Sequence, residues 1–543
     1  MTDLPLAASF APASYEDWVK KAELALKGAS LDKLTKPSRD GIPIRPLYAR
    51  SETPAIAARA GGLAWQLVQR VDAADPVMAN GFALEDLQGG ANALALTFAG
   101  AHSARGFGLR DAQAATLDLA LKDVSVHAIA LRFEPGPQWR DVPAAMLKLA
   151  EMRSLSPAQL DVNFGLDPFC EGAGLAEAAK LLRAADFGGP LVNADGRVFH
   201  DAGATEAEEL GFALHRGLQY LRALDGDAAA ISFTLSASPD MFLTLAKFRA
   251  VRLLWARVCQ AAGLPMQPVA LHGETSFRHL TRTDPHVNLL RAVAGVFGAG
   301  LGGADSVSVL PFTAASGLAD SFARRMARNA QVMLVEESHL HRVGDPAAGS
   351  GYISSLTDQL AEKAWGIMQQ AARGADISAA IAKSHEAQMA RVAQRVWPIT
   401  GTSEFPNVKE ILAAAPQAGT RLSAPFEALR LAAQAQKPCV RLVTLGRIAD
   451  FTARAQWVQN LVAAGGVGVD ETARDVAIIC GSDEAYAAEI DAAVRALKAA
   501  GVQHIWIAGK PGVTEAVSHY LHAGMDVIAG LKLLHTQLGL GGK

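Results

Sequence analysis

The chain has 543 residues, of which 50% are apolar and 19% are charged. At roughly 150 residues per domain, this length favours three to four structural units, and the composition excludes an intrinsically disordered chain. The formal net charge of −3 gives no polyanion-binding signature, so we expect no nucleic-acid partner.

Cysteine spacing, the N-terminus and hydropathy indicate the compartment. The cysteines lie far apart, without a C-x-x-C pair or metal-ligand spacing: Cys170, Cys259, Cys439 and Cys480. This pattern favours a reducing compartment and no metal site. The first ten residues include Asp3 and no basic residue, unlike a secretory signal. The longest uncharged stretch, 87–104, is broken by Gly and polar residues, which indicates a strand with loops instead of a membrane span. We therefore predict a cytoplasmic protein without membrane association.

Residues 1–55 predict an N-terminal arm. Apolar residues between Tyr15 and Leu26 follow a helical period, and the helix is expected to end near Gly28. Residues 40–48 then combine alternating apolar residues with two prolines, which is incompatible with a central strand. We expect this segment to wrap in an extended form over another surface.

Residues 56–395 repeat a short apolar strand followed by a longer helical pattern. Eight such units favour a closed, TIM-like parallel barrel of the α/β class, and a single open sheet is the alternative. The expected helices include Pro143–Arg153, Glu206–Leu224 and Phe242–Ala262. The expected strands are Asn92–Phe98, His127–Phe133, Leu160–Phe164, Arg197–His200, Ile231–Ser236, Val269–His272, Ser306–Leu310 and, with the weakest pattern, Arg342–Val343.

Residues 396–436 are turn-forming, rich in Ala and Gln and non-periodic, which predicts a linker. The strand–helix alternation resumes over residues 437–543 and predicts a small, doubly wound, flavodoxin-like domain. Its expected strands are Val440–Leu445, Val476–Cys480, His504–Ala508 and Asp526–Ala529. Its expected helices are Ala453–Ala463, Glu484–Ala500 and Val513–Ala523.

Motifs along the whole chain resemble, in order, those of the cobalamin-dependent acyl-CoA mutases, methylmalonyl-CoA mutase in particular. An arm motif F-x-P-x-x-Y-x-x-W begins at Phe10, the family's Y-H pair resembles Phe199-His200, and its D-P-x-G-G-S-Y-Y turn resembles residues 345–352. The other similar segments are 26–28, 40–48, 241–256, 272–276, 284–288 and 327–331. The resemblance implies a barrel, a belt-like linker and a cobalamin-binding-type domain, which in active members isomerise (R)-methylmalonyl-CoA to succinyl-CoA.

The loop that supplies the cobalt-ligating histidine in active members departs from the family motif D-x-H-x-x-G. Ile448 stands at the aspartate position, Asp450 at the histidine position and Ala453 at the glycine position. A carboxylate is a poor substitute for imidazole on low-spin cobalt, and Ile448 cannot orient a ligand. The later cofactor motifs, at 480–484 and 508–509, are altered as well. We expect this chain to bind no cobalamin, and Asp450 to cap the helix beginning near Ala453.

The barrel also lacks groups that the resemblance assigns to catalysis. Arg70 replaces a tyrosine beside the substrate, and Gly165 replaces a glutamine that reaches the thioester. His200 remains as a vestigial catalytic candidate, with a structural, hydrogen-bonded histidine as the alternative. Bulky residues in 127–133 could plug the substrate channel. We therefore expect no catalytic residue, and the substrate-binding residues stay open.

Two groups of residues allow both a binding and a packing interpretation. The glycine-rich run 295–303 lacks the Lys-Ser/Thr of a P-loop, so we predict a packing role for it. Lys247, Arg249 and Arg252 lie on one expected helix, where they could bind CoA phosphates or form a solvated or interface face.

These observations predict a catalytically silent small subunit of a heterodimeric methylmalonyl-CoA mutase. Its expected partner is a homologous large subunit that carries adenosylcobalamin and is stabilised by pseudo-twofold pairing. The chain would meet acyl-CoA only through that complex. Two alternatives remain open: a catalytic acyl-CoA mutase with unusual cofactor ligation, and a stand-alone scaffold or regulatory protein.

Overall fold

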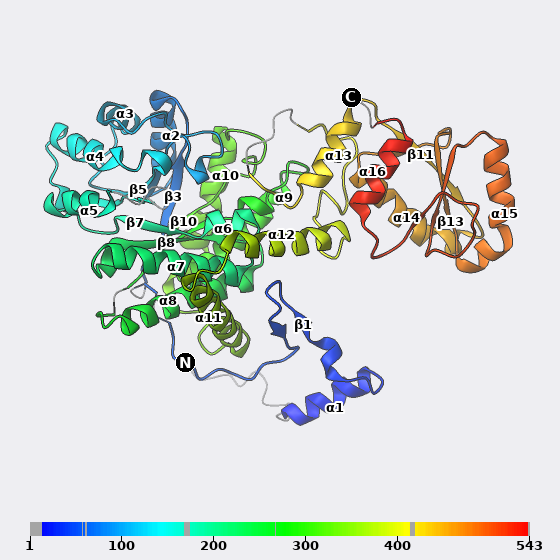
Figure 1. Cartoon of the computed structure of the whole chain (residues 1–543), viewed down its shortest axis with the longest axis horizontal. Helices are drawn as coiled ribbons and strands as arrows, with labels where there is room; N and C mark the ends of the chain where they lie inside the picture. The colour runs from blue at the N-terminus through cyan, green and yellow to red at the C-terminus, as the bar shows by residue number, and fades with distance from the viewer. Residues whose placement is uncertain are drawn as a thin grey trace.

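The computed structural model describes residues 13–56, 58–59, 62–167, 174–266, 268–412 and 419–540. The barrel and the C-terminal domain lie at opposite ends of the long axis, and the arm lies below the region that joins them (Figure 1). Cys259, Cys439 and Cys480 are free thiols, and Cys170 lies outside the described residues. In the described part of the chain, none of the helices combines the length and the apolar character needed to cross a membrane.

The arm contains the predicted helix and a small ribbon. Helix α1 (Tyr15–Ala25) begins with a capping box, in which Ser14 accepts from the backbone N–H of Asp17 and the Asp17 carboxylate accepts in return. The 3₁₀ turn η1 (Leu31–Leu34) and an antiparallel pair, β1 (Lys36–Pro37) with β2 (Pro43–Ile44), follow. No side chain of α1 is buried. The apolar residues of this helix therefore have no core of their own.

Eight parallel strands form the barrel, in the order β6-β5-β4-β3-β10-β9-β8-β7. Residues that continue β6 join the two edges, because Phe164 N–H donates to Pro190 O and Leu166 N–H to Leu191 O. This closure confirms the predicted barrel over the open sheet. The strands are β3 (Gln66–Val71), β4 (Ala93–Thr97), β5 (Ala130–Glu134), β6 (Asp161–Asn163), β7 (Val192–Asp195), β8 (Ile231–Ala237), β9 (Ala270–Thr275) and β10 (Ser306–Ser308).

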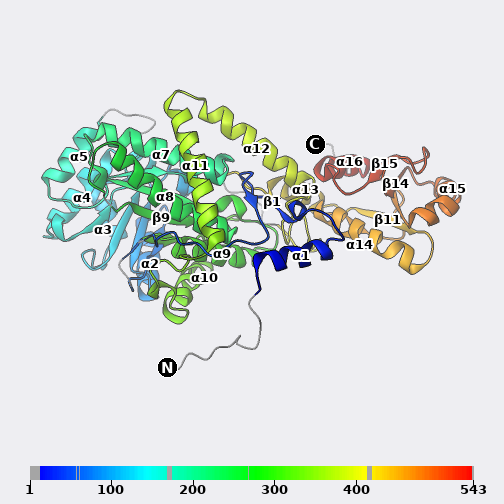
Figure 2. The same ribbon diagram turned by 90° about the horizontal axis from the view of Figure 1, so that it is seen from below.

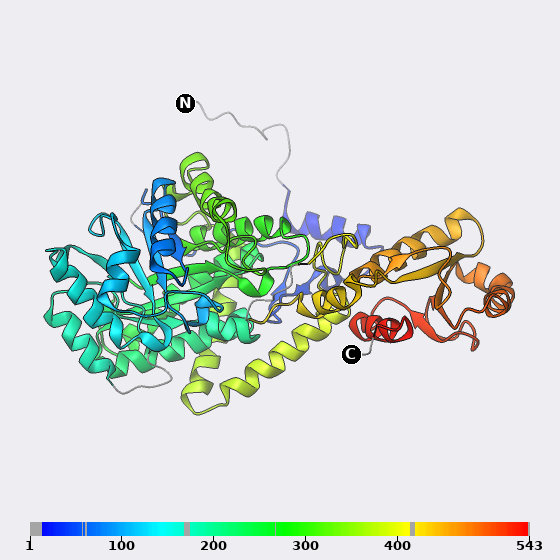
Figure 3. The ribbon, with the colours of Figure 1, turned by 90° about the horizontal axis from the view of Figure 1, so that it is seen from above.

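Helices surround the barrel, and outward-facing strand residues pack against them. Phe98, Phe133 and Phe164 stack in this outer layer. The helices are α2 (Pro76–Gln88), α3 (Ala114–Ala120), α4 (Asp141–Met152), α5 (Leu175–Ala184), α7 (Glu206–Ala223), α8 (Met241–Ala261), α9 (Val287–Leu301) and α10 (Ser321–Val332). Helix α11 (Gly351–Ala372) packs on α7 and α8, and α12 (Ile377–Ala393) runs from the barrel toward the C-terminal domain (Figures 2 and 3).

The glycine-rich run lies mostly within α9 and confirms the packing prediction. A Cβ at Gly298 would lie 2.8 Å from the carbonyl oxygen of Met241, and one at Gly295 would lie 2.7 Å from that of Ala237. Only residues without a side chain allow α9 to approach the end of β8 and the start of α8 this closely.

Two expected barrel strands are wrong. Residues 197–200 lie in the short helix α6 (Arg197–Ala202), directly after the true strand β7. Arg342 is the last residue of the 3₁₀ turn η8 (Leu340–Arg342) and Val343 caps that turn, so neither residue lies in a strand. Strands β7 and β3 together restore the count of eight, and the apolar pattern of β3 is hidden because it carries the buried polar residues Gln69 and Arg70.

The C-terminal domain is a five-stranded parallel sheet with the order β12-β11-β13-β14-β15. This is the 2-1-3-4-5 order of flavodoxin-like folds, as predicted. The strands are β11 (Cys439–Thr444), β12 (Gly468–Val469), β13 (Val476–Cys480), β14 (His504–Ala508) and β15 (His519–Leu521). The helices are α14 (Ile448–Ala464), α15 (Asp483–Ala499) and α16 (Val527–Gln537).

The structure corrects three predictions for this half of the chain. The helix expected over 513–523 is absent, and β15 lies in that range. The strand expected over 526–529 is the start of α16, whose first turn is capped by the Asp526 carboxylate. The segment 396–436 contains a regular helix, α13 (Ala424–Gln434), which packs on α16.

Candidate functional site

Charged side chains fill the C-terminal end of the barrel interior, where TIM-barrel enzymes hold their active sites. Arg70, on β3, donates to Glu274 Oε2 of β9 at 2.7 Å, and Arg105 donates to Glu274 Oε1 at 2.9 Å. Arg197 Nη1, on α6, lies 3.0 Å from an oxygen of both Glu134 and Glu274. These residues and three buried neighbours form the barrel-mouth ion cluster, which comprises Arg70, Arg105, Arg132, Glu134, Asp195, Arg197, Asp201 and Glu274.

The arginines keep the carboxylates of this cluster ionised. Burial alone would raise the pKa of Glu274, but Arg197, Arg105 and Arg70 lower it to about 2. Burial also opposes ionisation of Glu134, and Arg197 with Arg70 holds the pKa of that group well below its usual value. The cluster is therefore a set of mutually compensated charges, because Glu134 and Glu274 each face three guanidinium groups, whereas Asp195 pairs with Arg197 and Asp201 with Arg105.

Arg132 extends into the barrel interior, where it also lines a cavity of about 110 Å³ toward the N-terminal ends of the strands. It donates to Thr234 Oγ1 of β8 at 2.5 Å, whereas the neighbouring Phe133 faces the outer helices. Of the bulky residues predicted to plug the channel, Arg132 is thus one whose side chain points into the barrel interior. The cavity beside Arg70 and Arg105 measures about 20 Å³. That volume accommodates about one water molecule.

Gly165 cannot simply be replaced by the glutamine of active members. Its backbone has a φ of 56°, and a Cβ at this position would lie 2.0 Å from the carbonyl oxygen of Phe133. A side chain here would displace β5 or the continuation of β6. The local backbone path of this barrel therefore differs from one that presents a glutamine to a thioester.

His200 lies on α6 instead of at a strand end, and it is fully buried. Its Nε2 is 2.7 Å from Ser276 Oγ, and its Nδ1 is 3.3 Å from Glu209 Oε2. Burial, reinforced by the positive charge of Arg278, lowers the pKa of His200 well below its usual value. The imidazole is therefore neutral, and both of its nitrogens face protein groups.

A chain of hydrogen bonds fixes the tautomers of two histidines. Arg39 of the arm lies 2.7 Å from His279 Nε2, and arginine can only donate, so the His279 proton is on Nδ1. His279 Nδ1 then donates to Ser276 Oγ at 2.9 Å, and Ser276 donates to His200 Nε2. The remaining proton of His200 is on Nδ1, beside Glu209. The arm is thus connected to the barrel interior through His200.

Lys247 contacts a cluster of three side chains whose residue types could bind a metal ion. His200, Glu206 and Glu209 offer ligand atoms within 4.8 Å of one another. Lys247 Nζ contacts the carboxylates of both Glu206 and Glu209. Burial alone would lower the pKa of Lys247, but the two glutamates raise it, so the ammonium group stays charged. A divalent cation would be repelled by this charge, and the Lys247 ammonium group already neutralises the carboxylates that a cation would need.

The basic residues of α8 do not form the phosphate-binding or solvated face considered from the sequence. Lys247, Arg249 and Arg252 are all buried. Arg249 forms an ion pair with Asp345, and Arg252 donates to the carbonyl oxygen of Gly303. All three fasten α8 to neighbouring parts of the barrel.

The loop between β11 and α14 does not fit base-off cobalamin. Helix α14 begins at Ile448, five residues before the predicted start at Ala453, so Asp450 lies in its first turn. The Asp450 carboxylate accepts from the backbone N–H of Arg447 at 2.8 Å and from its Nε at 3.2 Å. Ile448 is 76% exposed. The loop thus supplies no imidazole. As the sequence predicts, the Asp450 carboxylate caps a helix, although that helix begins earlier than expected.

Comparison with known proteins decides the family. The family model described as methylmalonyl-CoA mutase matches residues 190–406. The chain is also 34% identical to the methylmalonyl-CoA mutase small subunit of Streptomyces virginiae, over 99% of this chain and 98% of that protein. The chain belongs to the methylmalonyl-CoA mutase family.

Further similar proteins support this family assignment. It is 37% identical to the probable methylmalonyl-CoA mutase small subunit of Mycobacterium tuberculosis, over 78% of each chain. It is 30% identical to the methylmalonyl-CoA mutase small subunit of Propionibacterium freudenreichii subsp. shermanii, over 99% of this chain and 97% of that protein. The family resemblance predicted from the motifs is therefore confirmed.

Sequence reasoning missed the acidic half of the barrel-mouth ion cluster. Three of these acids lie at the end of a barrel strand: Glu134 and Asp195 are the last residues of β5 and β7, and Glu274 is the penultimate residue of β9. Carboxylates in that position were the available signal, because the C-terminal strand ends of a parallel barrel converge on one mouth.

Proposed function

We propose that this chain is the catalytically silent small subunit of a heterodimeric methylmalonyl-CoA mutase. In this role it pairs with a homologous large subunit, which it stabilises and which carries adenosylcobalamin. The observation that carries the proposal is the barrel-mouth ion cluster, since buried ion pairs occupy the end of the barrel where this fold holds substrates.

The state of the retained imidazole supports catalytic silence. His200 is fully buried and hydrogen-bonded to Ser276, and it faces Glu209 on its other side. To meet a thioester carbonyl, His200 would have to break a chain of hydrogen bonds that extends to Arg39. The cavity of about 20 Å³ beside Arg70 is far smaller than an acyl-CoA thioester.

The β11–α14 loop supports placing the cofactor in the partner. Asp450 is held by Arg447 in a helix cap, and Ile448 offers no hydrogen bond to orient a ligand. In the proposed complex, adenosylcobalamin and the acyl-CoA substrate are bound by the large subunit alone.

The arm supports a protein partner. Tyr15 is 59% exposed and Leu24 is 82% exposed, and none of the side chains of α1 is buried. A short helix is marginal in water without tertiary packing, so α1 gains its stability from a surface that covers these residues. The relatives in Streptomyces virginiae and Propionibacterium freudenreichii are named small subunits, which accords with a larger homologous partner. We place this complex in the cytoplasm.

Co-expression with a homologous large subunit that has an intact D-x-H-x-x-G loop tests the proposal. We expect a 1:1 complex that isomerises (R)-methylmalonyl-CoA when adenosylcobalamin is added. The isolated chain is expected to show no isomerase activity and no base-off cobalamin spectrum. Either signal from the isolated chain would support the catalytic alternative instead, and absence of any complex would support the stand-alone scaffold.

A matched pair of substitutions tests the role of the arm. Leu24→Asp places a charge on the exposed face of α1 and is expected to weaken the complex at least about tenfold, because a buried unpaired charge is costly. Leu181→Asp makes the same change at another exposed position, 46% exposed on α5, and is expected to leave the affinity unchanged. Equal effects of both substitutions would argue against docking through the arm.

A further inference from the structure

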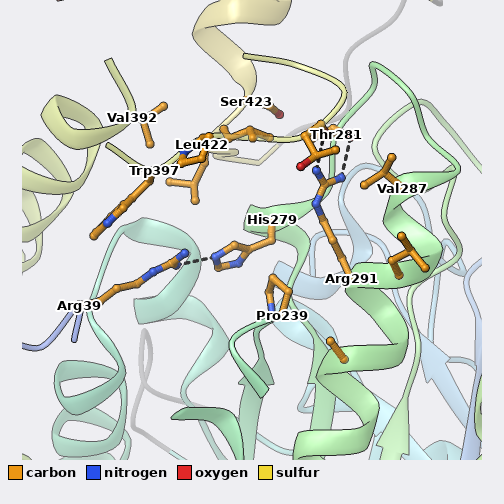
Figure 4. A pocket seen from close by; sticks show the side chains of 15 residues that line it. Arg39, Pro239, His279, Thr281, Val287, Arg291, Val392, Trp397, Leu422 and Ser423 are labelled. Atoms are coloured by element: carbon orange, nitrogen blue, oxygen red, sulfur yellow. Dashed lines mark hydrogen bonds between the residues drawn. The ribbon is translucent and has the colours of Figure 1, made fainter. Parts of the chain in front are cut away.

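A cavity of about 400 Å³ lies where the arm, the barrel and the linker meet. Arg39 comes from the arm, His279 follows β9, Arg291 lies on α9, and Trp397 and Leu422 come from the segment after the barrel. Figure 4 shows Arg39 and Arg291 on opposite sides of His279, with Trp397 and Leu422 above it. Three parts of the chain that are distant in sequence therefore share one cavity.

The polar lining of this cavity is cationic and has no acidic partner. None of the described residues that line it is Asp or Glu. Neither Arg39 nor Arg291 has a carboxylate within 4.0 Å among the described residues, although Asp240 interacts with Arg39 at longer range, and Asp284 and Glu427 do so with Arg291. Two guanidinium groups thus border the cavity without a contacting counter-ion, a state that anion binding would stabilise.

Both guanidinium groups have hydrogen-bond donors to spare. Arg39 donates one bond to His279, which is neutral and therefore does not compensate the charge. Arg291 donates to Thr281, Asn288 and the carbonyl oxygen of Thr400, all of which are neutral. Each guanidinium has five N–H groups, so each retains donors for a carboxylate.

Most of the remaining wall is apolar, although His279, Thr281, Thr400 and Ser423 also line the cavity. The aliphatic residues that line the cavity are Val287, Leu290, Ala294, Val392, Ile399 and Leu422. Arg39 lies over the ring of Trp397, 4.7 Å from its centroid, which holds the guanidinium at one side of the cavity. His279 lies between the two arginines, and the aliphatic side chains around it can contact the hydrocarbon body of a ligand.

We infer that this cavity is a binding site for a short aliphatic dicarboxylate, with one carboxylate on Arg39, the other on Arg291 and the methylene chain against the aliphatic wall. The ligand would bridge the arm to the barrel and so hold the arm in place. This inference is independent of the proposed function, because it concerns the isolated chain.

Calorimetric titration of the full chain with glutarate tests the site. We expect saturable binding in the millimolar range or tighter, with butyrate and 1,5-pentanediol binding at least about tenfold more weakly because each lacks one or both charges. Glutarate is also expected to slow proteolysis of the arm. No saturable glutarate binding, or equal binding of the diol or of butyrate, would overturn the inference.

Three variants locate the binding. Arg39→Met removes one charge and is expected to lower glutarate affinity at least about tenfold. Arg45→Met is the matched control on the same arm, because Arg45 lies over Tyr48 and does not line the cavity. Ala294→Phe fills the aliphatic side without changing a charge and should also weaken binding. Unchanged affinity in both Arg39→Met and Ala294→Phe, each checked for folding by circular dichroism, would contradict the site.

Discussion

At the scale of single residues, buried charges determine what the interior of this barrel can hold. Glu274 receives contacts from Arg70, Arg105 and Arg197, so one carboxylate balances much of the positive charge at the mouth. Replacing the tyrosine of active members by Arg70 thus changes more than a substrate contact, because Arg70 requires buried acidic partners to be stable.

Removing the charge of Glu274 should destabilise the fold strongly. Glu274→Gln keeps the shape of the side chain but leaves three buried arginines short of one negative charge, and we expect a loss of about 3–5 kcal/mol in the free energy of unfolding. Glu151→Gln is the matched control on an exposed side chain and is expected to leave the stability nearly unchanged. Urea denaturation measures both, and similar losses would refute the importance of the cluster.

The same carboxylate predicts an acid-dependent loss of stability. The pKa of Glu274 is lowered from 4.5 to about 2 in the folded chain, so between these values the unfolded chain binds a proton that the folded chain does not. This contribution is complete above pH 4.5 and is lost as the pH falls toward 2. We expect the free energy of unfolding to decline less steeply with acid in Glu274→Gln than in the native chain. Parallel declines would exclude Glu274 as the source.

The residues of the candidate site were only partly predictable from the sequence. Asp450 was expected as a helix cap, and His200 as a vestigial catalytic candidate with a hydrogen-bonded, structural histidine as the alternative, because sequence motifs mark both positions. The partners of His200 could not be predicted: Ser276 is 76 residues away, and Arg39 reaches the same chain of bonds from the arm. Contacts at such separations follow from the closure of the barrel, which periodicity does not specify.

At the scale of helices and strands, periodicity predicted the elements that keep a regular apolar face or a continuous apolar run. Helix α7, expected over 206–224, is observed as Glu206–Ala223, and its start is set by a capping box of Thr205 and Glu208. Strands β13 and β14 agree residue by residue with the expectation. β3 was missed because Arg70 and Gln69 interrupt its apolar pattern, although the folded barrel pairs both with buried acids.

The contact between the arm and the barrel should depend on pH through Asp40. Its Oδ1 accepts from the backbone N–H of Ala207, and its Oδ2 is buried without a hydrogen-bond partner among the described residues. Burial, with a contribution from Glu206, raises the pKa of Asp40 from 3.8 to about 6. The docked arm therefore binds a proton that the free arm releases, and docking should tighten as the pH falls through about 6.

Hydrogen exchange of residues 36–48 measures this effect. Protection is expected to be higher at a pH below 6 than above it in the native chain. Asp40→Asn removes the titrating group but keeps the acceptor for Ala207, so its protection should not change over this range. A pH dependence that persists in Asp40→Asn would show that another group controls the arm.

At the scale of the whole molecule, the apolar cores are separate. The barrel core includes Leu96 and Trp255, whereas the two faces of the C-terminal sheet pack around Ile478 and Ile479. Val392 at the end of α12 belongs to the C-terminal core, so the boundary between the two folding units lies within that helix. Such separate cores favour two unfolding transitions over one.

Matched substitutions in the two cores should move the two transitions independently. Ile478→Ala and Leu96→Ala each empty a fully buried position in the middle of a parallel strand, and each is expected to cost about 2–5 kcal/mol. Ile478→Ala should lower the melting temperature of the C-terminal domain alone, and Leu96→Ala that of the barrel alone. Calorimetry resolves the two transitions, and a single Trp reporter at Trp506 or Trp255, with the other tryptophans replaced by Phe, assigns them. If both substitutions shift one common transition, the barrel and the C-terminal domain unfold as a single cooperative unit, and the contacts between α12, α13 and α16 join their cores.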